Sequence, residues 1–254
     1  MFQKNKQKRK KLKDAEALKE WNKKFSALVF GTLLRKHKTI CTGYAYLLKE
    51  LAYHAGLSCV IIHGYGRTAQ ANIGGPGIAN HSWNAVQLHN KWYLCDATWS
   101  SGAVDPEKAM FVKKYNDAYF LSDPSLFVRS HYPLDTTWLL LDDKPTLQEF
   151  LNRPLTYSTI FQYKIDRLLP ETFDITASKG ETVSFQFTRN AERSIEKLEL
   201  NIKGAQESFS FYPELQQDVN GLYRVDHTFD WKGTYVVHFL LDNSYAFTYS
   251  VKVK

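Results

Sequence analysis

A thiol, an imidazole and a carboxylate occur along this sequence in an order that suits nucleophilic chemistry. Cys41 opens a stretch with helical periodicity, and the first turn of a helix has free N–H groups and a partial positive charge. This position lowers the pKa of a thiol and favours the reactive thiolate. His81 and Asp96 follow on two predicted neighbouring strands. The three residues could act as a nucleophile, a general base and the acid that orients the base.

The relation between His81 and Asp96 depends on the hairpin that joins their strands. A two-residue loop at His89-Asn90 is favoured, because Asn tolerates left-handed backbone. This register places Asp96 opposite Trp83 and makes His81 and Asp96 diagonal neighbours on one face, roughly 7 Å apart at the backbone. It directs Cys95 to the other face. A three-residue loop would put His81 and Asp96 on opposite faces.

Each of these residues also has a simpler structural interpretation. Cys41 could be a small core residue, His81 a hydrogen-bonded strand histidine, and Asp96 a strand-end acid that caps a turn. Three cysteines are too few for a disulfide framework. The sequence has no CxxC pair and no HExxH motif, so we expect neither a metal site nor a cofactor.

Hydrophobic periodicity and turn residues predict the elements that position these side chains. Residues 66–80 are rich in Gly, Ala, Asn and Pro and are expected to form a loop before His81. Gly56 is the expected stop of the helix that Cys41 begins. The other predicted elements are a helix over Asp14–Phe30, strands over Ser58–His63, His81–Leu88 and Trp92–Thr98, and a short helix from Thr146 with capping-box spacing to Glu149.

The character of the sequence changes after about residue 155. Apolar and polar residues alternate there in about seven strand-like runs separated by Gly, Asn and Asp, as at Phe185 and Phe187. This pattern predicts a β-sandwich of immunoglobulin-like type, with a small barrel as the alternative. We therefore expect two domains, over residues 1–153 and 154–254.

Three segments resemble the motifs of the transglutaminase-like superfamily in type, order and spacing. They are Cys-Thr-Gly-Tyr-Ala at 41–45, His-Ser-Trp-Asn-Ala-Val at 81–86 and Trp-Tyr-Leu-Cys-Asp-Ala-Thr-Trp at 92–99. Later segments look like the kyphoscoliosis peptidase-like branch of that superfamily, and the resemblance covers about residues 30–153. These segments are Tyr119-Phe120-Leu121, His131-Tyr132-Pro133, Trp138 to Leu141 and Thr146 to Phe150.

The resemblance implies an α+β fold with a papain-like or transglutaminase-like core, in which N-terminal helices pack on an antiparallel sheet. It implies a Cys41, His81 and Asp96 triad that acts on a protein or peptide substrate. Family members often carry an upstream Trp or Gln that donates to the oxyanion, and Trp21 is the candidate here. Trp83 shares the face of His81 and is a candidate for lining the cleft.

Two classes of function fit these observations. The first is a thiol acyl-transfer enzyme, which is a protease or amidase if water accepts the acyl group and a transglutaminase if an amine does. The second is a catalytically weak or inactive scaffold that binds a protein or polymer through its β-sandwich. The reactivity of the Cys41 thiol discriminates between them.

Composition and charge narrow the classes further. Hydrophobic residues make up 44% of the 254 residues, which excludes a mostly disordered chain. The formal charge is +7, but seven of the 33 basic residues lie in residues 1–13, and the remaining 26 equal the 26 acidic residues. This basic tail could make weak contact with an anionic surface, and no nucleic-acid binding is expected. We expect no transmembrane segment, and no signal peptide is visible.

Overall fold

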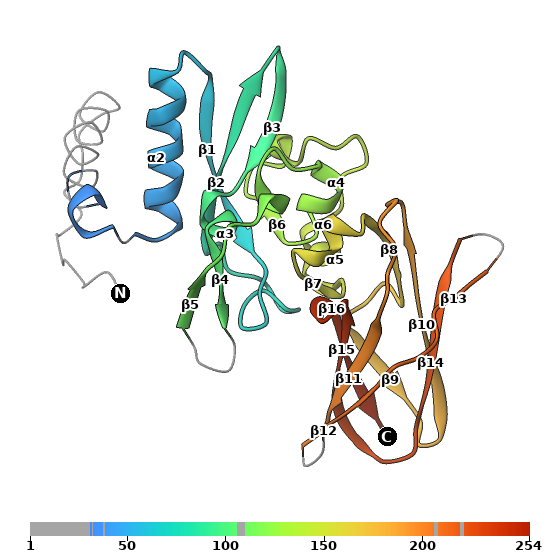
Figure 1. The fold of residues 1–254 in the computed structure, drawn as a ribbon. Helices are drawn as coiled ribbons and strands as arrows, with labels where there is room; N and C mark the ends of the chain where they lie inside the picture. Colours follow the sequence, from blue (N-terminus) through green and yellow to red (C-terminus); the bar gives the residue numbers. More distant parts are fainter. Residues whose placement is uncertain (1–30, 32, 38, 106–109, 206–207, 219–220) are drawn as a thin grey trace.

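A computed structural model of the chain describes residues 31, 33–37, 39–105, 110–205, 208–218 and 221–254. The basic tail, the helix predicted over Asp14–Phe30 and Trp21 all lie outside the described residues. The described chain has a mixed first half and a β-rich second half, with mostly antiparallel sheets (Figure 1). It is therefore an α+β, β-rich fold. No helix within the described ranges is both long enough and apolar enough to cross a membrane.

The first half is built on a four-stranded antiparallel sheet with the order β3-β2-β1-β6. Helix α2 packs against β1 and β2. The Asn84 side-chain amide of β2 fastens this contact, because it donates to the Ala45 carbonyl of α2 at 3.0 Å and to the Val60 carbonyl of β1 at 3.2 Å. The bounds are α2 Cys41–His54, β1 Cys59–Gly66, β2 His81–Leu88, β3 Lys91–Cys95 and β6 His131–Pro133.

The predicted start and end of α2 are confirmed. The helix begins at Cys41, and its C-cap is Ala55. Gly56 follows with a φ of 72°, a left-handed conformation that glycine adopts without strain. The Leu57 N–H then bonds back to the Ala52 carbonyl at 2.8 Å. The thiol of Cys41 therefore lies at the N-terminal end of a helix of 14 residues.

The predicted register of the β2–β3 hairpin is confirmed. Leu88 pairs with Lys91 and Asn84 with Cys95. His89 and Asn90 form the two-residue loop, with φ values of 47° and 63°. The first strand has the predicted bounds, His81–Leu88.

The strand predicted over Trp92–Thr98 is wrong at its C-terminal end. Strand β3 stops at Cys95, and Ala97–Ser100 forms a short helix, α3, with Asp96 as its N-cap. The Asp96 side chain accepts hydrogen bonds from the backbone N–H groups of the first helical turn, which ends the strand pairing. Asp96 therefore lies beyond the last cross-strand pair instead of opposite Trp83.

Short elements connect the sheet to the second half. The capping box predicted at Thr146 and Glu149 is present in both directions and begins α5. These elements are β4 Gly102–Asp105, β5 Met110–Lys113, the 3₁₀ helix η1 Asp117–Tyr119, α4 Pro124–Phe127, the 3₁₀ helix η2 Thr136–Leu139 and α5 Leu147–Asn152.

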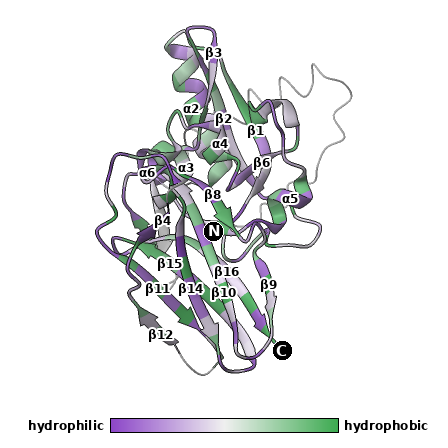
Figure 2. Cartoon of the chain, turned by 90° about the vertical axis from the view of Figure 1, so that its right-hand side faces the viewer, coloured by the Kyte–Doolittle hydropathy of each residue, from purple (hydrophilic) through white to green (hydrophobic). Residues whose placement is uncertain are grey.

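The second half contains two sheets that share one apolar core. One sheet has the order β13-β14-β10-β8, and the other has the order β12-β11-β15-β16-β7, with β9 parallel to β16. Phe185 of β10 packs against Phe239 of β15 with ring centroids 5.2 Å apart. Figure 2 shows hydrophobic and hydrophilic residues alternating along these strands, as expected where one face of each sheet is buried.

The described part of Ile165–Val253 contains nine strands, β8 to β16, where about seven were expected. The immunoglobulin-like topology stays a prediction. The bounds are β7 Leu155–Thr156, α6 Thr159–Gln162, β8 Ile165–Leu169, β9 Asp174–Ala177, β10 Glu181–Arg189, β11 Leu198–Lys203, β12 Ser208–Phe211, β13 Gln216–Gln217, β14 Tyr223–Phe229, β15 Gly233–Leu241 and β16 Ser244–Val253.

Candidate functional site

Cys41 lies at the start of α2, where no side-chain cap accepts the free N–H groups of the first helical turn. Its N-cap, Ile40, makes no side-chain capping bond, and the first turn contains no acidic residue. A hydrogen bond to His81 lowers the pKa of the Cys41 thiol, with a further contribution from the Ser82 N–H, although partial burial opposes the shift. The thiolate form of Cys41 is thus favoured.

The other two thiols lie in different surroundings. Burial raises the pKa of Cys59, even though the Asn84 side chain lies 3.4 Å from its sulfur. Burial raises the pKa of Cys95 to about 11, and its sulfur accepts the Leu121 N–H at 3.4 Å. All three cysteines are free, and Cys41 alone has a lowered pKa.

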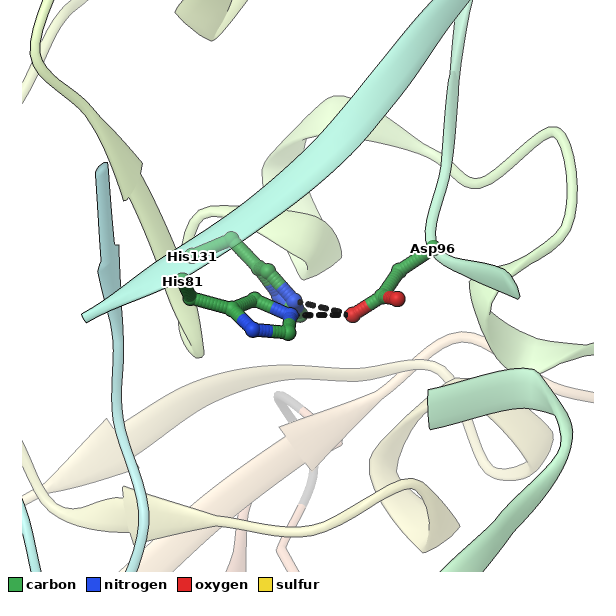
Figure 3. A group of neighbouring side chains, drawn as sticks. All are labelled: His81, Asp96 and His131. Atoms are coloured by element: carbon green, nitrogen blue, oxygen red, sulfur yellow. Dashed lines mark hydrogen bonds and ion pairs between the residues drawn. The ribbon is translucent and has the colours of Figure 1, made fainter. Parts of the chain in front are cut away.

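Asp96 is a buried carboxylate that accepts four N–H groups. One oxygen, Oδ1, caps α3 by accepting the N–H groups of Thr98 at 2.8 Å and Trp99 at 3.2 Å. The other oxygen, Oδ2, lies 2.6 Å from His81 Nε2 and 3.0 Å from His131 Nε2 (Figure 3). Burial alone would raise the pKa of Asp96, but the bonds from His131 and His81 hold it well below its usual range. The turn-capping interpretation of Asp96 and its contact with His81 are therefore both correct, one for each oxygen.

His81 stands between the carboxylate and the thiol. Because Nε2 bonds to Asp96, Nδ1 is the ring nitrogen left for Cys41. Burial favours the neutral ring, yet the hydrogen bonds to Asp96 and Cys41 raise the pKa of His81 to about 9. Together with the lowered pKa of Cys41, this favours a thiolate and an imidazolium at neutral pH.

The end of β1 leaves little room beside His81. A Cβ atom at Gly66 would lie 2.9 Å from His81 Cβ and 3.0 Å from its Cγ. Asn80 and Asn72 hold Gly66 in place, since the Gly66 N–H donates to Asn80 Oδ1 at 2.8 Å and the Gly66 carbonyl accepts from Asn72 Nδ2 at 2.9 Å. The predicted loop over residues 66–80 therefore helps to position the imidazole.

Sequence reasoning did not assign a role to His131, which the structure places in direct contact with Asp96. It lies 35 residues farther along the chain, and the pairing of β6 with β1 brings it there. Burial lowers the pKa of His131 to about 4. The only feature of the sequence that pointed to this residue was the family resemblance of the segment at 131–133.

The two tryptophan candidates have different outcomes. Trp83 is 1% exposed and packs in the core with Phe127, and its ring lies 6.0 Å from that of His81. It therefore supports His81 from the interior instead of lining an open cleft. Trp21, the candidate oxyanion donor, lies outside the described residues.

His81, Asp96 and His131 form a group whose nitrogen and oxygen atoms lie within 4.8 Å of one another and could hold a metal ion. The spacing fits hydrogen bonds better. His81 Nε2 lies 2.6 Å from Asp96 Oδ2, whereas two ligands of a tetrahedral zinc ion lie about 3.3 Å apart when each bond is about 2.0 Å. Nε2 of His81 and Nε2 of His131 both lie within hydrogen-bond distance of Asp96 Oδ2, as expected for two donors that share one acceptor.

Comparison with known proteins found several relatives. The chain is 36% identical to mouse kyphoscoliosis peptidase over 170 residues, which cover 66% of this chain and 25% of that protein. It is 35% identical to Drosophila melanogaster hillarin over 147 residues, which cover 52% of this chain and 18% of hillarin. It is 27% identical to a LIM and transglutaminase domain protein of Caenorhabditis elegans over 194 residues, which cover 69% of this chain and 26% of that protein.

These similarities support a transglutaminase-like branch for the chain. No family model matches it. The chain spans about a quarter of the length of the kyphoscoliosis peptidases that it matches. A chain of the swine CD8αα homodimer covers 35% of this chain with 17% identity and a TM-score of 0.24, which is too low to bear on the fold.

Proposed function

We propose that this chain catalyses thiol-dependent acyl transfer on peptide or glutamine carboxamides, with Cys41 as nucleophile, His81 as acid and base, and Asp96 as the group that orients His81. One observation carries the proposal: the pKa of the thiol at the start of α2 is lowered by His81, whose other nitrogen lies 2.6 Å from a buried carboxylate. This is the arrangement that activates a cysteine nucleophile.

The proposed reaction proceeds in two steps. The Cys41 thiolate attacks the carbonyl carbon of the carboxamide, and His81 donates its proton to the departing nitrogen as the C–N bond breaks. This leaves a thioester on Cys41. His81 then takes a proton from the acceptor, which attacks the thioester and releases the thiolate. Water as the acceptor gives hydrolysis, and a primary amine gives transamidation.

The start of α2 also supports stabilisation of the oxyanion. The first N–H groups of a helix have no intrahelical acceptor, and Ile40 supplies no side-chain cap to them. The backbone N–H of Cys41 can donate to the tetrahedral intermediate, where such a donor contributes most. Trp21 is proposed as a second donor.

The relatives give independent support to this assignment. A peptidase name and a transglutaminase name both occur among them, and peptidases and transglutaminases both act on carboxamides. We propose that residues 1–153 form the transglutaminase-like catalytic domain with a papain-like core. Residues 154–254 would form an immunoglobulin-like sandwich that positions or selects a protein or peptide substrate.

The test uses casein as a generic protein substrate, with a fluorescent primary amine for transamidation and peptide release for hydrolysis. We expect the native chain and Cys59→Ala to act on casein and to form a thioester that intact mass measurement detects. Cys41→Ala should do neither. Cys59→Ala is the matched control, because Cys41 and Cys59 are both partly exposed thiols. Equal activity of Cys41→Ala and the native chain would overturn the proposal.

The scaffold hypothesis predicts a different outcome. A folded chain whose Cys41 reacts no faster than a cysteine in the denatured chain would favour a binding role. The second half exposes large aromatic side chains that such a role could use, since Trp231 is 71% exposed and Tyr212 is 58% exposed. In that case partner binding should survive Cys41→Ala unchanged.

A further inference from the structure

One oxygen of Asp96 is shared by two imidazoles. Asp96 Oδ2 lies 2.6 Å from Nε2 of His81 and 3.0 Å from Nε2 of His131, and Figure 3 shows both rings pointing at this atom. Asp96 Oδ1 is occupied by the backbone N–H groups of Thr98 and Trp99. A carboxylate oxygen can only accept, so Nε2 of each histidine carries a proton.

The other ring nitrogen of His131 also has polar neighbours, the Ser130 hydroxyl and the Phe127 backbone. His131 Nδ1 lies 2.9 Å from the Ser130 hydroxyl, so Nδ1 can accept the hydroxyl proton while Nε2 donates to Asp96. Its ring stacks on Phe127 with centroids 4.1 Å apart and contacts Trp99 at 4.4 Å. The side chain is 0% exposed, so water cannot replace the bond that it makes.

We propose that His131 is a positioning residue, which shares the Asp96 carboxylate with His81 and so fixes both where Asp96 points and how tightly it holds the His81 ring. The inference rests on the proposed function of Cys41, His81 and Asp96. It adds a fourth side chain to that site. His131 touches no reacting atom. It acts through Asp96, and its ring also lies 5.3 Å from that of His81.

The shared oxygen has a chemical consequence for the reaction. Each N–H donor stabilises the charge of the carboxylate and weakens its pull on the other donors. Without His131, the lone pairs of Oδ2 would serve His81 alone, and the imidazolium would hold its proton more strongly. A more strongly held proton is a poorer acid for the departing amine. His131 therefore keeps His81 a useful acid.

Several titratable groups face this cluster, and each enters the pH dependence. They are Cys41 from α2, His81 from β2, Cys95 from β3, Tyr119 from η1 and His131 from β6, all around Asp96. Because these groups interact, the profile of thiol reactivity reports pKa values of the whole cluster. The upper step of that profile marks loss of the proton shared by Cys41 and His81.

The test compares His131→Phe, which fills the same space without a donor, with His131→Gln. Glutamine Nε2 is as many bonds from the backbone as histidine Nε2, so it can still donate to Asp96. The readout is the rate of Cys41 alkylation by iodoacetamide between pH 5 and pH 10. We expect the upper step to move up by roughly half to one pH unit in His131→Phe and to stay in place in His131→Gln.

An unchanged upper step in folded His131→Phe would overturn the inference, as would the same shift in both variants. A measurement on the native chain covers the case in which His131→Phe does not fold. The ¹⁵N shifts of His131 should show a neutral ring protonated on Nε2, and a ring protonated on Nδ1 would overturn the inference. If iodoacetamide alkylates Cys41 of the native chain no faster than Cys59 and Cys95 at pH 6, the proposed function fails instead. The two failures are therefore distinguishable.

Discussion

The carboxylate of Asp96 accepts two N–H groups on each oxygen, so even a substitution of equal size disturbs it. In Asp96→Asn, either orientation of the amide turns its NH₂ group toward N–H donors. The His81 imidazolium also loses its counter-charge. The change therefore affects both the start of α3 and the proposed chemistry.

For Asp96→Asn we expect a loss of stability of about 1–3 kcal/mol, because buried donors are left without an acceptor. We expect turnover to fall on the order of 10²-fold, less than the ~10⁴-fold of the serine-protease triad, since a thiol needs less help from a base. The upper step of the alkylation profile should move to lower pH. Urea unfolding and the pH profile measure the two effects, and an unchanged profile would make Asp96 purely structural.

His81 and Asp96 are expected to act as a unit. The double variant His81→Ala/Asp96→Asn should therefore be little slower than His81→Ala alone. Turnover of the single and double variants checks this, and additive losses would contradict it.

The three thiols differ enough to be ranked by reactivity. Cys41 has a lowered pKa, whereas burial raises the pKa of Cys59 and raises that of Cys95 to about 11. At pH 6 we expect iodoacetamide to alkylate Cys41 at least tenfold faster than either other thiol. Peptide mass mapping after brief treatment gives the order. Preferential labelling of Cys59 or Cys95 would be inconsistent with the site.

Burial of His131 links the stability of the chain to acid pH. A folded pKa of about 4 lies below the unfolded value of about 6.5, so the unfolded chain binds the extra proton. The resulting stability is present above pH ~6.5 and is lost as the pH falls toward about 4. We expect a loss on the order of 2–3 kcal/mol over this interval.

This acid dependence should be weaker in His131→Gln, because glutamine does not titrate. Urea midpoints between pH 4 and pH 7 measure it. His54→Gln, which removes an exposed histidine, is the matched control and should keep the native dependence. Equal slopes for His131→Gln and the native chain would mean that His131 is already protonated in the folded state.

At the scale of elements, the site depends on how closely β1 and β2 approach at their ends. A Cβ at Gly66 would overlap His81, as the distance of 2.9 Å to His81 Cβ shows. Gly66→Ala should displace the imidazole while leaving most of the sheet intact. Since a displacement of about 1 Å can cost 10²-fold in rate, we expect acyl transfer to slow by roughly 10- to 100-fold.

The control for Gly66→Ala is Gly31→Ala, where the added Cβ meets no atom of the described residues within 4 Å. This variant should keep the native rate. Circular dichroism establishes that both variants are folded, and the rate of Cys41 alkylation at pH 6 provides the comparison. If Cys41 of Gly66→Ala were alkylated at the native rate, the strands could move apart without displacing the His81 imidazole.

At the scale of the whole molecule, one buried arginine ties the two halves together. The Arg67 guanidinium donates to the Asn72 carbonyl at 3.1 Å, to the Pro154 carbonyl at 2.9 Å and to the Arg153 carbonyl. Arg67 is 1% exposed, and burial lowers its pKa to about 10, so it remains charged at neutral pH. The proposed domain boundary at residues 153–154 is therefore a hydrogen-bonded, buried junction.

We expect Arg67→Met to lower the free energy of unfolding by about 2–4 kcal/mol, because buried backbone carbonyls lose their donor. Limited proteolysis should leave the native junction intact, since Leu155 is 2% exposed and Thr156 is 5% exposed, and should cut near 153–156 in the variant. Arg167→Met is the control, because the Arg167 side chain is 60% exposed. Cleavage of the native chain at this junction would show that the halves separate readily.

Local interactions explain what the sequence alone determined. The start of α2 at Cys41, its stop at Gly56, the capping box at Thr146 and the two-residue hairpin loop each depend on residues close together in the chain. Whereas the α+β class was implied by the resemblance to the transglutaminase-like superfamily, the β-rich second half follows from periodicity, which is equally local. These features were predictable for that reason.

Tertiary structure decided the rest, because it depends on groups far apart in the sequence. The cap of α3 competes with strand pairing at Asp96, and periodicity cannot rank these two outcomes. His131 reaches Asp96 only because β6 pairs with β1, and Arg67 reaches residue 154, which is 87 residues farther along the chain, only in the folded structure. Trp83 has the same alternation whether it lines a cleft or fills the core, and it is buried by core residues from several elements, including Phe127 of α4.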